Sequence, residues 1–221
     1  MPTMETNERH DTLRADAQRN LARILEAAAE VFADQGGEAS VAAVAERAGL
    51  GTATIFRRFP TKDDLLAAVV EQRFRTMAEE TRRAAEIDDP AEALRRVMLV
   101  SVAGYVGDRL VAEAIGTPIF HRPRLRALNA ELTARKEQVL RRAQEAGEVR
   151  PDVTLADVSL LLAAVGFVGQ RLDAEAPNAW RRCFDIVLDG LRAGRTRPLA
   201  RASVTLAHLP ALHDADAPPS R

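Results

Sequence analysis

The side chains whose types and spacing suit a chemical task are concentrated between residues 40 and 66. Arg57 can donate two hydrogen bonds to a guanine edge, and Ala53 leaves room for close approach to a base or for a thymine methyl group. Arg58 and Lys62 can bind phosphates through charge, which fixes position without reading sequence. These properties are typical of a surface that contacts double-stranded DNA. The alternative for the two arginines is an ordinary solvated helix face.

Two short helices are predicted to position these side chains. The first begins after Ser40, a good N-cap residue, and ends at Gly49, which can adopt a left-handed turn. The second covers residues 52–58, and a capping box at Thr61 then starts a long helix over residues 62–85. Two short helices joined by a glycine turn indicate a helix-turn-helix, whose second helix enters the major groove of DNA.

This stretch resembles the N-terminal domain of the TetR (tetracycline-repressor) family of bacterial transcription regulators. About residues 20–66 carry the match, from a first helix closing on Phe32-Ala33-Asp34-Gln35-Gly36, through the helix-turn-helix, to the Phe59-Pro60-Thr61-Lys62 close. The resemblance implies base contacts from the second short helix and phosphate contacts around it. The implied base-contacting residues are Thr52, Ala53 and Arg57, and the implied phosphate-contacting residues are Ser40, Thr54, Arg58, Thr61 and Lys62.

Two residues depart from the family pattern. Phe56 stands where the family usually has a tyrosine whose hydroxyl binds phosphate, so one backbone contact is expected to be missing. Gly51 stands where serine often caps the recognition helix, so that helix is expected to be capped less firmly. Both departures bear on the affinity for DNA rather than on the presence of the motif.

The whole chain is predicted to be all-α, with about nine helices. Alanine, the best helix former, occurs 41 times among the 221 residues, whereas aromatic residues make up 4%. The predicted helices include a short one over about residues 109–115. The expected organisation is a mobile N-terminal arm (1–14), a helix-turn-helix DNA-binding domain (15–66), a helical ligand-binding and dimerisation domain (67–194) and a mobile C-terminal tail (195–221).

In the resembled family the larger domain binds a small ligand between its central helices and dimerises through its last two. The predicted helices over about residues 155–172 and 178–193 carry broad apolar faces, which can pack on a second copy as a four-helix bundle. Candidate residues for a small apolar or amphipathic ligand are Met98, Tyr105, Phe120, His121, Phe167 and Gln170, which combine apolar bulk with a few polar atoms. Packing in the domain core is the alternative for each of them.

Composition and motifs argue against other classes of protein. The formal net charge is -1, and residues 1–66 hold 8 basic and 11 acidic side chains, so bulk charge does not drive DNA binding. A single cysteine, Cys183, rules out an internal disulfide framework and a thiolate zinc site. No metal-ligand spacing, phosphate loop or nucleophile elbow indicates an enzyme, a metal or a cofactor. The sequence has no evident secretory signal or membrane span, so a cytoplasmic protein is expected.

The resulting hypothesis is a homodimeric, ligand-responsive transcription regulator that binds a palindromic DNA operator. A repressor is expected, released when a ligand moves the helix over residues 62–85 and so changes the spacing of the two DNA-reading heads. The alternatives are a transcriptional activator, or a helical small-molecule sensor or carrier whose DNA head is degenerate because of Phe56 and Gly51.

Overall fold

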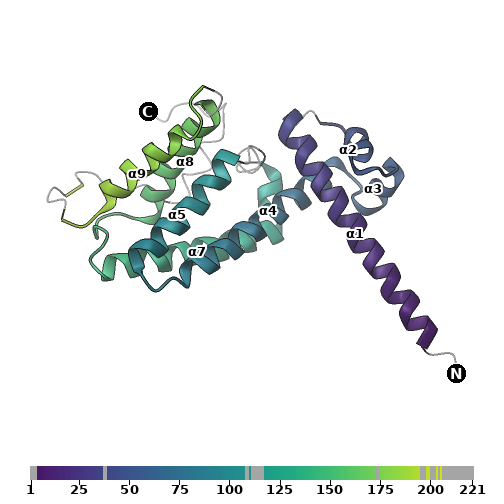
Figure 1. Ribbon diagram of the computed structural model, residues 1–221, viewed down its shortest axis with the longest axis horizontal. Coiled ribbons are helices and arrows are strands. Elements are labelled where there is room, and N and C mark those ends of the chain that lie inside the picture. Colours follow the sequence, from purple (N-terminus) through teal and green to yellow (C-terminus); the bar gives the residue numbers. More distant parts are fainter. Residues whose placement is uncertain are drawn as a thin grey trace. The chain divides into compact units, whose positions relative to one another are not determined.

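A computed structural model describes residues 4–36, 39–107, 110, 117–172, 175–194, 198–199, 203 and 205. The chain divides into two compact units, residues 1–69 and residues 70–221. In the described ranges the secondary structure is helical apart from one isolated bridge between Val149 and Arg192, so the predicted all-α class is confirmed. The helices are α1 (Met4–Gln35), α2 (Val41–Ala48), α3 (Thr52–Arg58), α4 (Lys62–Ala85), α5 (Pro90–Gly107), the 3-10 helix η2 (Pro118–His121), α7 (Pro123–Glu145), α8 (Leu155–Leu172) and α9 (Ala179–Leu191) (Figure 1).

The first helix begins earlier than the sequence pattern indicated. The sequence pattern predicted a helix start near residue 15, after a mobile arm over residues 1–14, whereas α1 begins at Met4, so residues 4–14 are helical. Helix formation there needs no apolar stripe, because no proline or glycine interrupts residues 4–35. The sequence prediction followed only the part of α1 that carries an apolar stripe.

The core of the smaller unit joins α1 to the two short helices. Ile24, Ala28 and Phe32 lie on one stripe of α1 and are buried, and α1 packs on α2. Val44 of α2 and Ile55 of α3 are completely buried. Because these apolar anchors come from three different helices, burying them together fixes the direction in which α3 presents its outer face.

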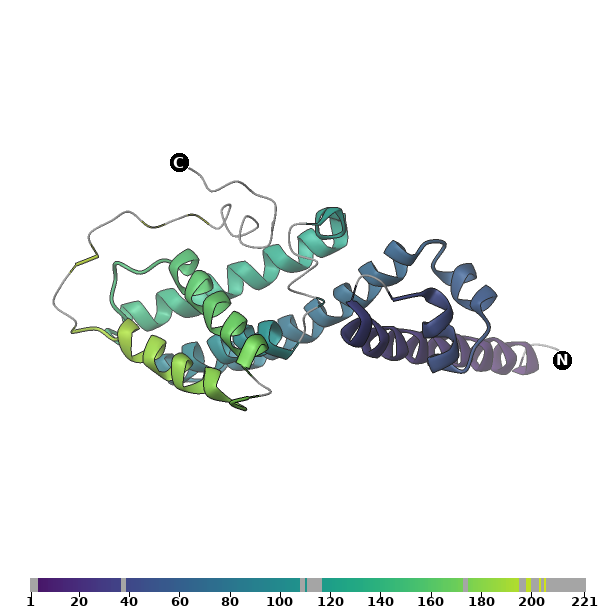
Figure 2. The same cartoon turned by 90° about the horizontal axis from the view of Figure 1, so that it is seen from above.

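The larger unit is a bundle in which α5 packs on α7 and α8, and α8 packs on α9 (Figures 1 and 2). Its interior is filled by apolar side chains such as Val97, Met98, Leu140 and Leu162. Arg142 of α7 donates hydrogen bonds to the backbone carbonyls of Ala85 and Ile87, which ties the end of α4 to α7.

The start of α8 is closed by a capping box between Thr154 and Asp157. The amide of Thr154 donates to the Asp157 carboxylate over 2.9 Å, and the Asp157 amide donates to the Thr154 hydroxyl over 3.3 Å. Two described residues of the C-terminal segment bind nearby. Ser203 donates to Asp157 over 2.7 Å, and the amide of Leu199 donates to Asp152 over 3.0 Å.

Most of two other predicted elements lies outside the described residues. These are the short helix expected over about residues 109–115, of which only Leu110 is described, and most of the tail over 195–221. Among the described helices, α8 is the one with the length and apolarity of a membrane span, at a mean hydropathy of 1.5. It packs on α5 and α9, and 39% of its residues are buried in the structure.

Candidate functional site

The turn between α2 and α3 is closed by backbone hydrogen bonds around Gly49. Gly49 has φ +62, and its amide donates to Glu46 over 3.0 Å, while the amide of Leu50 donates to Ala45 over 2.9 Å. Arg23 of α1 donates to the carbonyl of Ala48 over 2.6 Å, which ties the first helix to the same corner. A side chain at position 49 would require a strained backbone and would stand 3.2 Å from Arg23. The structure therefore has the helix-turn-helix corner that the glycine predicted.

One side of α3 is anchored and the other is exposed. Ile55 is completely buried, whereas Thr52, Ala53, Arg57 and Arg58 are exposed. Thr54 is partly buried and Phe56 is 46% exposed. The three predicted base-contacting residues therefore share an outer surface with Arg58.

Arg57 and Arg58 differ from the other arginines of the smaller unit whose side chains are described. Arg19 pairs with Asp16, Arg47 bonds to Glu30 over 2.6 Å, and Arg23 is held by Ala48. Within the described part of the chain, neither Arg57 nor Arg58 has a hydrogen bond or an ion pair. Their guanidinium groups are thus available to an external anion, although residues 1–66 carry more acidic than basic side chains.

Two predicted phosphate-binding positions stand just before helices. Ser40 is the N-cap of α2, and its hydroxyl oxygen accepts a hydrogen bond from the amide of Ala43 over 3.1 Å. Thr61 precedes α4 and forms the predicted capping box, in which its amide and its hydroxyl donate to Asp64 over 3.1 Å and 2.7 Å. Because both donors of Thr61 already bind Asp64, a phosphate would have to compete with that carboxylate. Lys62, in the first turn of α4, is partly buried and has a polar partner.

A groove of about 560 Å³ lies between α1 and α3. Thr54, Arg57 and Arg58 line one side, and Gln18 and Asn20 of α1 line the other. The sequence reading missed these two α1 residues, because polar side chains on an exposed helix carry no local signal. The side-chain amides of Gln18 and Asn20 therefore line the same groove as the two arginines of α3.

The larger unit holds a small interior cavity of about 20 Å³ among α5, α7 and α8, which is room for roughly one water molecule. Of the six predicted pocket residues, Met98 lines this cavity. The sequence reading missed the polar residues of its wall, which are Ser101 on α5, Lys136 on α7 and Ser159 on α8. Each of them occurs in a stretch that reads as ordinary amphipathic helix, so only the packing of the three helices identifies them.

Four of the other predicted pocket residues have described side chains, and none of the four lines this cavity. Phe120 packs edge to face on Phe74, with ring centroids 5.6 Å apart, and His121 is exposed. Phe167 and Gln170 lie on exposed positions of α8. The backbone of Tyr105 belongs to α5, and its side chain is outside the described residues.

Lys136 is a partly buried cation whose described surroundings are apolar apart from the two serines. Loss of water around the ammonium group lowers the pKa of Lys136 from 10.5 to about 8. The hydroxyls of Ser101 and Ser159 donate to the backbone carbonyls of Val97 and Leu155, over 2.9 Å and 2.7 Å. Lys136 itself has no ion pair or hydrogen bond within the described ranges.

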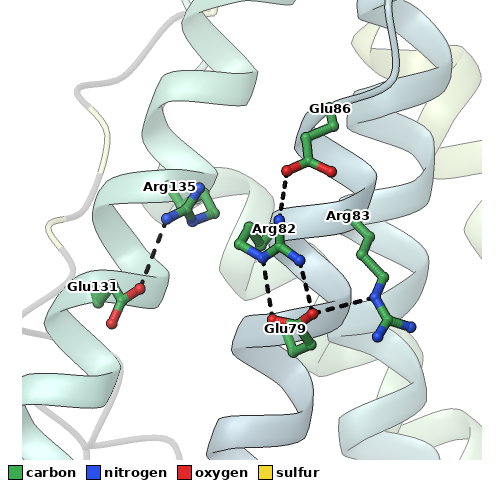
Figure 3. Close-up of polar contacts among 6 residues, drawn as sticks. All are labelled: Glu79, Arg82, Arg83, Glu86, Glu131 and Arg135. Carbon is green, nitrogen blue, oxygen red and sulfur yellow. Dashed lines mark hydrogen bonds and ion pairs between the residues drawn. The ribbon is translucent and has the colours of Figure 1, made fainter.

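Several charged side chains of the larger unit pair with one another. On α4, Glu79 binds Arg82 at 2.8 Å, and Arg82 also binds Glu86 at 2.6 Å, while Glu131 and Arg135 pair on α7 at 3.7 Å (Figure 3). The hydrogen bonds from Arg82 hold the pKa of Glu79 well below its usual range. These pairs are exposed to water and contribute little to stability.

Large apolar side chains are exposed on both α8 and α9. Phe167 is 58% exposed, Ile186 is 61% exposed and Leu161 is 41% exposed. Arg171 lies over the ring of Phe167 at 5.0 Å from its centroid. Burying these side chains against another protein would remove their apolar area from water.

Each of the two units matches a known protein family. Residues 24–69 match the family described as bacterial regulatory proteins, tetR family, and residues 89–193 match the Transcriptional regulator SbtR-like, C-terminal domain. The HTH-type transcriptional regulator UidR of Escherichia coli (strain K12) is 28% identical over 194 residues, which cover 83% of this chain and 94% of that protein.

Two solved structures are similar in sequence and in fold. The TetR transcription regulatory protein from Mycobacterium vanbaalenii is 33% identical, with a TM-score of 0.62, over 82% of this chain and 99% of that chain. The TetR transcriptional regulator SCO0520 from Streptomyces coelicolor is 28% identical, with a TM-score of 0.61, over 78% of this chain and 98% of that chain.

Proposed function

Because the chain belongs to the TetR family of DNA-binding transcription regulators, we propose that it is a repressor that a small-molecule ligand releases from a palindromic operator. The observation that carries the DNA-reading part of this proposal is the exposed face of α3, with its two arginines free of intramolecular partners among the described residues.

The roles proposed for α3 follow from the chemistry of its exposed side chains. Arg57 donates to a guanine edge, and Thr52 and Ala53, at the start of the helix, approach bases closely. Arg58 and Thr54 contact phosphates, as do Ser40 and Lys62 at the starts of α2 and α4. We assign Thr61 mainly to capping α4, because Asp64 accepts hydrogen bonds from both of its donors.

The proposed dimer forms through α8 and α9. The exposed side chains of Phe167, Ile186 and Leu161 belong to this surface, and α8 and α9 pack side by side (Figures 1 and 2). Two such helices and their symmetry mates make a four-helix bundle with a two-fold axis. A two-fold dimer presents two copies of α3, which matches a palindromic operator with half-sites one or more DNA turns apart.

The proposed switch acts through α4, which starts at the DNA-reading unit and ends in the ligand-binding unit. Arg142 ties the end of α4 to α7, the helix that carries Lys136 of the cavity wall. A ligand that separates the helices around the cavity therefore acts on a helix bound to α4. Release from DNA requires the ligand to bind the DNA-free conformation more tightly than the DNA-bound one.

A DNA-binding titration tests the proposal. Fluorescence anisotropy measures affinity for the DNA upstream of the protein's own gene and for random DNA of equal length, at several salt concentrations. We expect Arg57→Ala to cost about 1–3 kcal/mol and to relax preference at one base, and Lys62→Ala to weaken all sequences and reduce the salt slope by about one. Arg47→Ala is the matched control, because Arg47 is exposed but pairs with Glu30. Equal affinity of the native protein for both DNAs would refute sequence-specific reading.

A reporter assay tests the sign of regulation. A promoter carrying the operator is measured with and without the regulator. Higher expression in its absence supports a repressor, whereas lower expression in its absence identifies an activator and contradicts the proposal.

A further inference from the structure

The wall of the cavity in the larger unit includes one positively charged side chain, Lys136, and no acidic side chain among its described residues. Its wall is built from apolar side chains of α5, α7 and α8, including Val97, Leu140 and Leu162, together with Lys136 and two serines. Partly buried cations in proteins are ordinarily paired, because an ammonium group loses hydration that only a counter-charge or several acceptors can replace. Lys136 has no counter-charge in the described part of the chain.

The choice of residue at position 136 is also unusual for this chain. Of its 31 basic residues, 29 are arginine, and Lys136 is one of only two lysines. The preceding residue, Arg135, is paired with Glu131 (Figure 3). A flexible ammonium carries three rotatable donors and concentrates its charge at one point, which suits a compact anion.

The serine hydroxyls do not supply the missing charge. Ser101 and Ser159 use their hydrogens on backbone carbonyls, so their oxygens can only accept further hydrogen bonds. They can take up donors of the ammonium group, but they leave its positive charge uncompensated. Among the described residues of the cavity wall, none supplies a negative group.

We propose that the ligand of this cavity is an amphipathic anion, whose carboxylate or equivalent acidic group pairs with Lys136 while its apolar part lies among the side chains of α5 and α8. This inference rests on the proposed ligand-binding role of the larger unit and names the chemical class of the ligand. Burial of the ammonium group supports it, because desolvation has already lowered the pKa of Lys136 to about 8 and an anion reverses that effect.

The free volume of about 20 Å³ means that the ligand must displace side chains as it enters. Met98 lines the cavity, and its unbranched thioether adapts readily to a new neighbour. Ligand entry is therefore coupled to movement of α5 against α7 and α8, and the paired ligand is held by the helix that Arg142 ties to α4.

The scarcity of lysine allows a direct test by NMR. Protein labelled with 13C-lysine has two lysine side-chain signals, which the Lys62→Arg variant assigns. The probes are sodium decanoate and decan-1-ol, which share an apolar chain and differ in charge, at equal concentrations below micelle formation. We expect decanoate to shift the Cε signal of Lys136 and to raise the pKa of that group, and decan-1-ol to do neither.

Melting temperatures supply the second measurement. Decanoate is expected to raise the melting temperature of the native protein and of Arg135→Met, which loses one positive charge from the same helix. In Lys136→Met the affinity for decanoate is expected to fall about 10- to 100-fold, the usual loss for a hydrogen bond to a charged group. The native protein's Lys136 signal decides the question even if Lys136→Met does not fold.

Three results would overturn the inference: no response of Lys136 to millimolar decanoate, an equal response to decan-1-ol, or unchanged decanoate affinity in Lys136→Met. Operator binding in the absence of either probe is measured on the same samples. If the native protein without either probe does not prefer its operator over random DNA, the proposed function as a DNA-binding repressor is contradicted. If it binds its operator but Lys136 does not respond to decanoate, only the proposal of an anionic ligand is contradicted.

Discussion

Replacing Lys136 with methionine is expected to stabilise the ligand-free protein. Lowering the pKa of Lys136 from 10.5 to about 8 corresponds to about 3 kcal/mol at neutral pH, since each pKa unit is worth about 1.36 kcal/mol. Partial exposure of the side chain lets water reduce that penalty, so we expect the free energy of unfolding at pH 7 to rise by about 1–3 kcal/mol. Methionine keeps the unbranched shape and suits the apolar wall of the cavity.

The pH dependence separates this charge effect from a packing effect. Below pH 8 the ammonium is charged in both states, and the folded chain carries the full cost. Between about pH 8 and 10.5 the folded chain loses the proton while the unfolded chain keeps it, so the native protein gains stability with pH. The advantage of Lys136→Met should therefore shrink from its full value at pH 7 to about 1 kcal/mol or less at pH 10.

Urea unfolding followed by circular dichroism, at one fixed protein concentration because the proposed protein is a dimer, measures these differences. Arg135→Met is the matched control, because Arg135 is adjacent on α7 and is paired with Glu131. A Lys136→Met variant that is no more stable than the native protein at pH 7, or whose advantage does not change between pH 7 and pH 10, would refute the claim that Lys136 carries a desolvated charge.

Three further predictions concern the DNA-reading unit and the dimer. Phe56→Tyr adds a hydroxyl at an exposed position of α3 and should tighten operator binding by about 0.5–1.5 kcal/mol in anisotropy titrations; no gain would show that position 56 does not reach a phosphate. Gly51→Ser should raise the free energy of unfolding by a few tenths of a kcal/mol, because Gly51 caps α3 without a side-chain bond, has φ -75 and has open space for a Cβ; a loss of stability in urea would contradict this. Ile186→Asp should convert the dimer to monomer in light scattering, while Gln138→Glu, which adds the same charge on α7, should not; a dimer that survives Ile186→Asp would exclude this surface.

The local signals in the sequence were sufficient for most helix boundaries. Gly49 and the pairs Thr61 with Asp64 and Thr154 with Asp157 mark turns and caps whose hydrogen bonds form within a few residues, and the structure contains them. The start of α1 at Met4 was missed, because residues 4–14 have no apolar periodicity in the sequence. Sequence patterns therefore predict helix boundaries best where the boundary depends on one residue's backbone conformation or on hydrogen bonds between near neighbours.

The sequence by itself determined the helical class, the helix-turn-helix and the family resemblance, since capping, turn and periodicity signals are short-range. Only the tertiary structure decided which arginines stay unpaired on α3 and which polar groups meet in the interior. Met98, Lys136 and Ser159 are far apart in the chain and come together because α5, α7 and α8 pack on one another. Such a meeting of residues from separate helices depends on how apolar faces are buried against each other, and no local pattern contains that information.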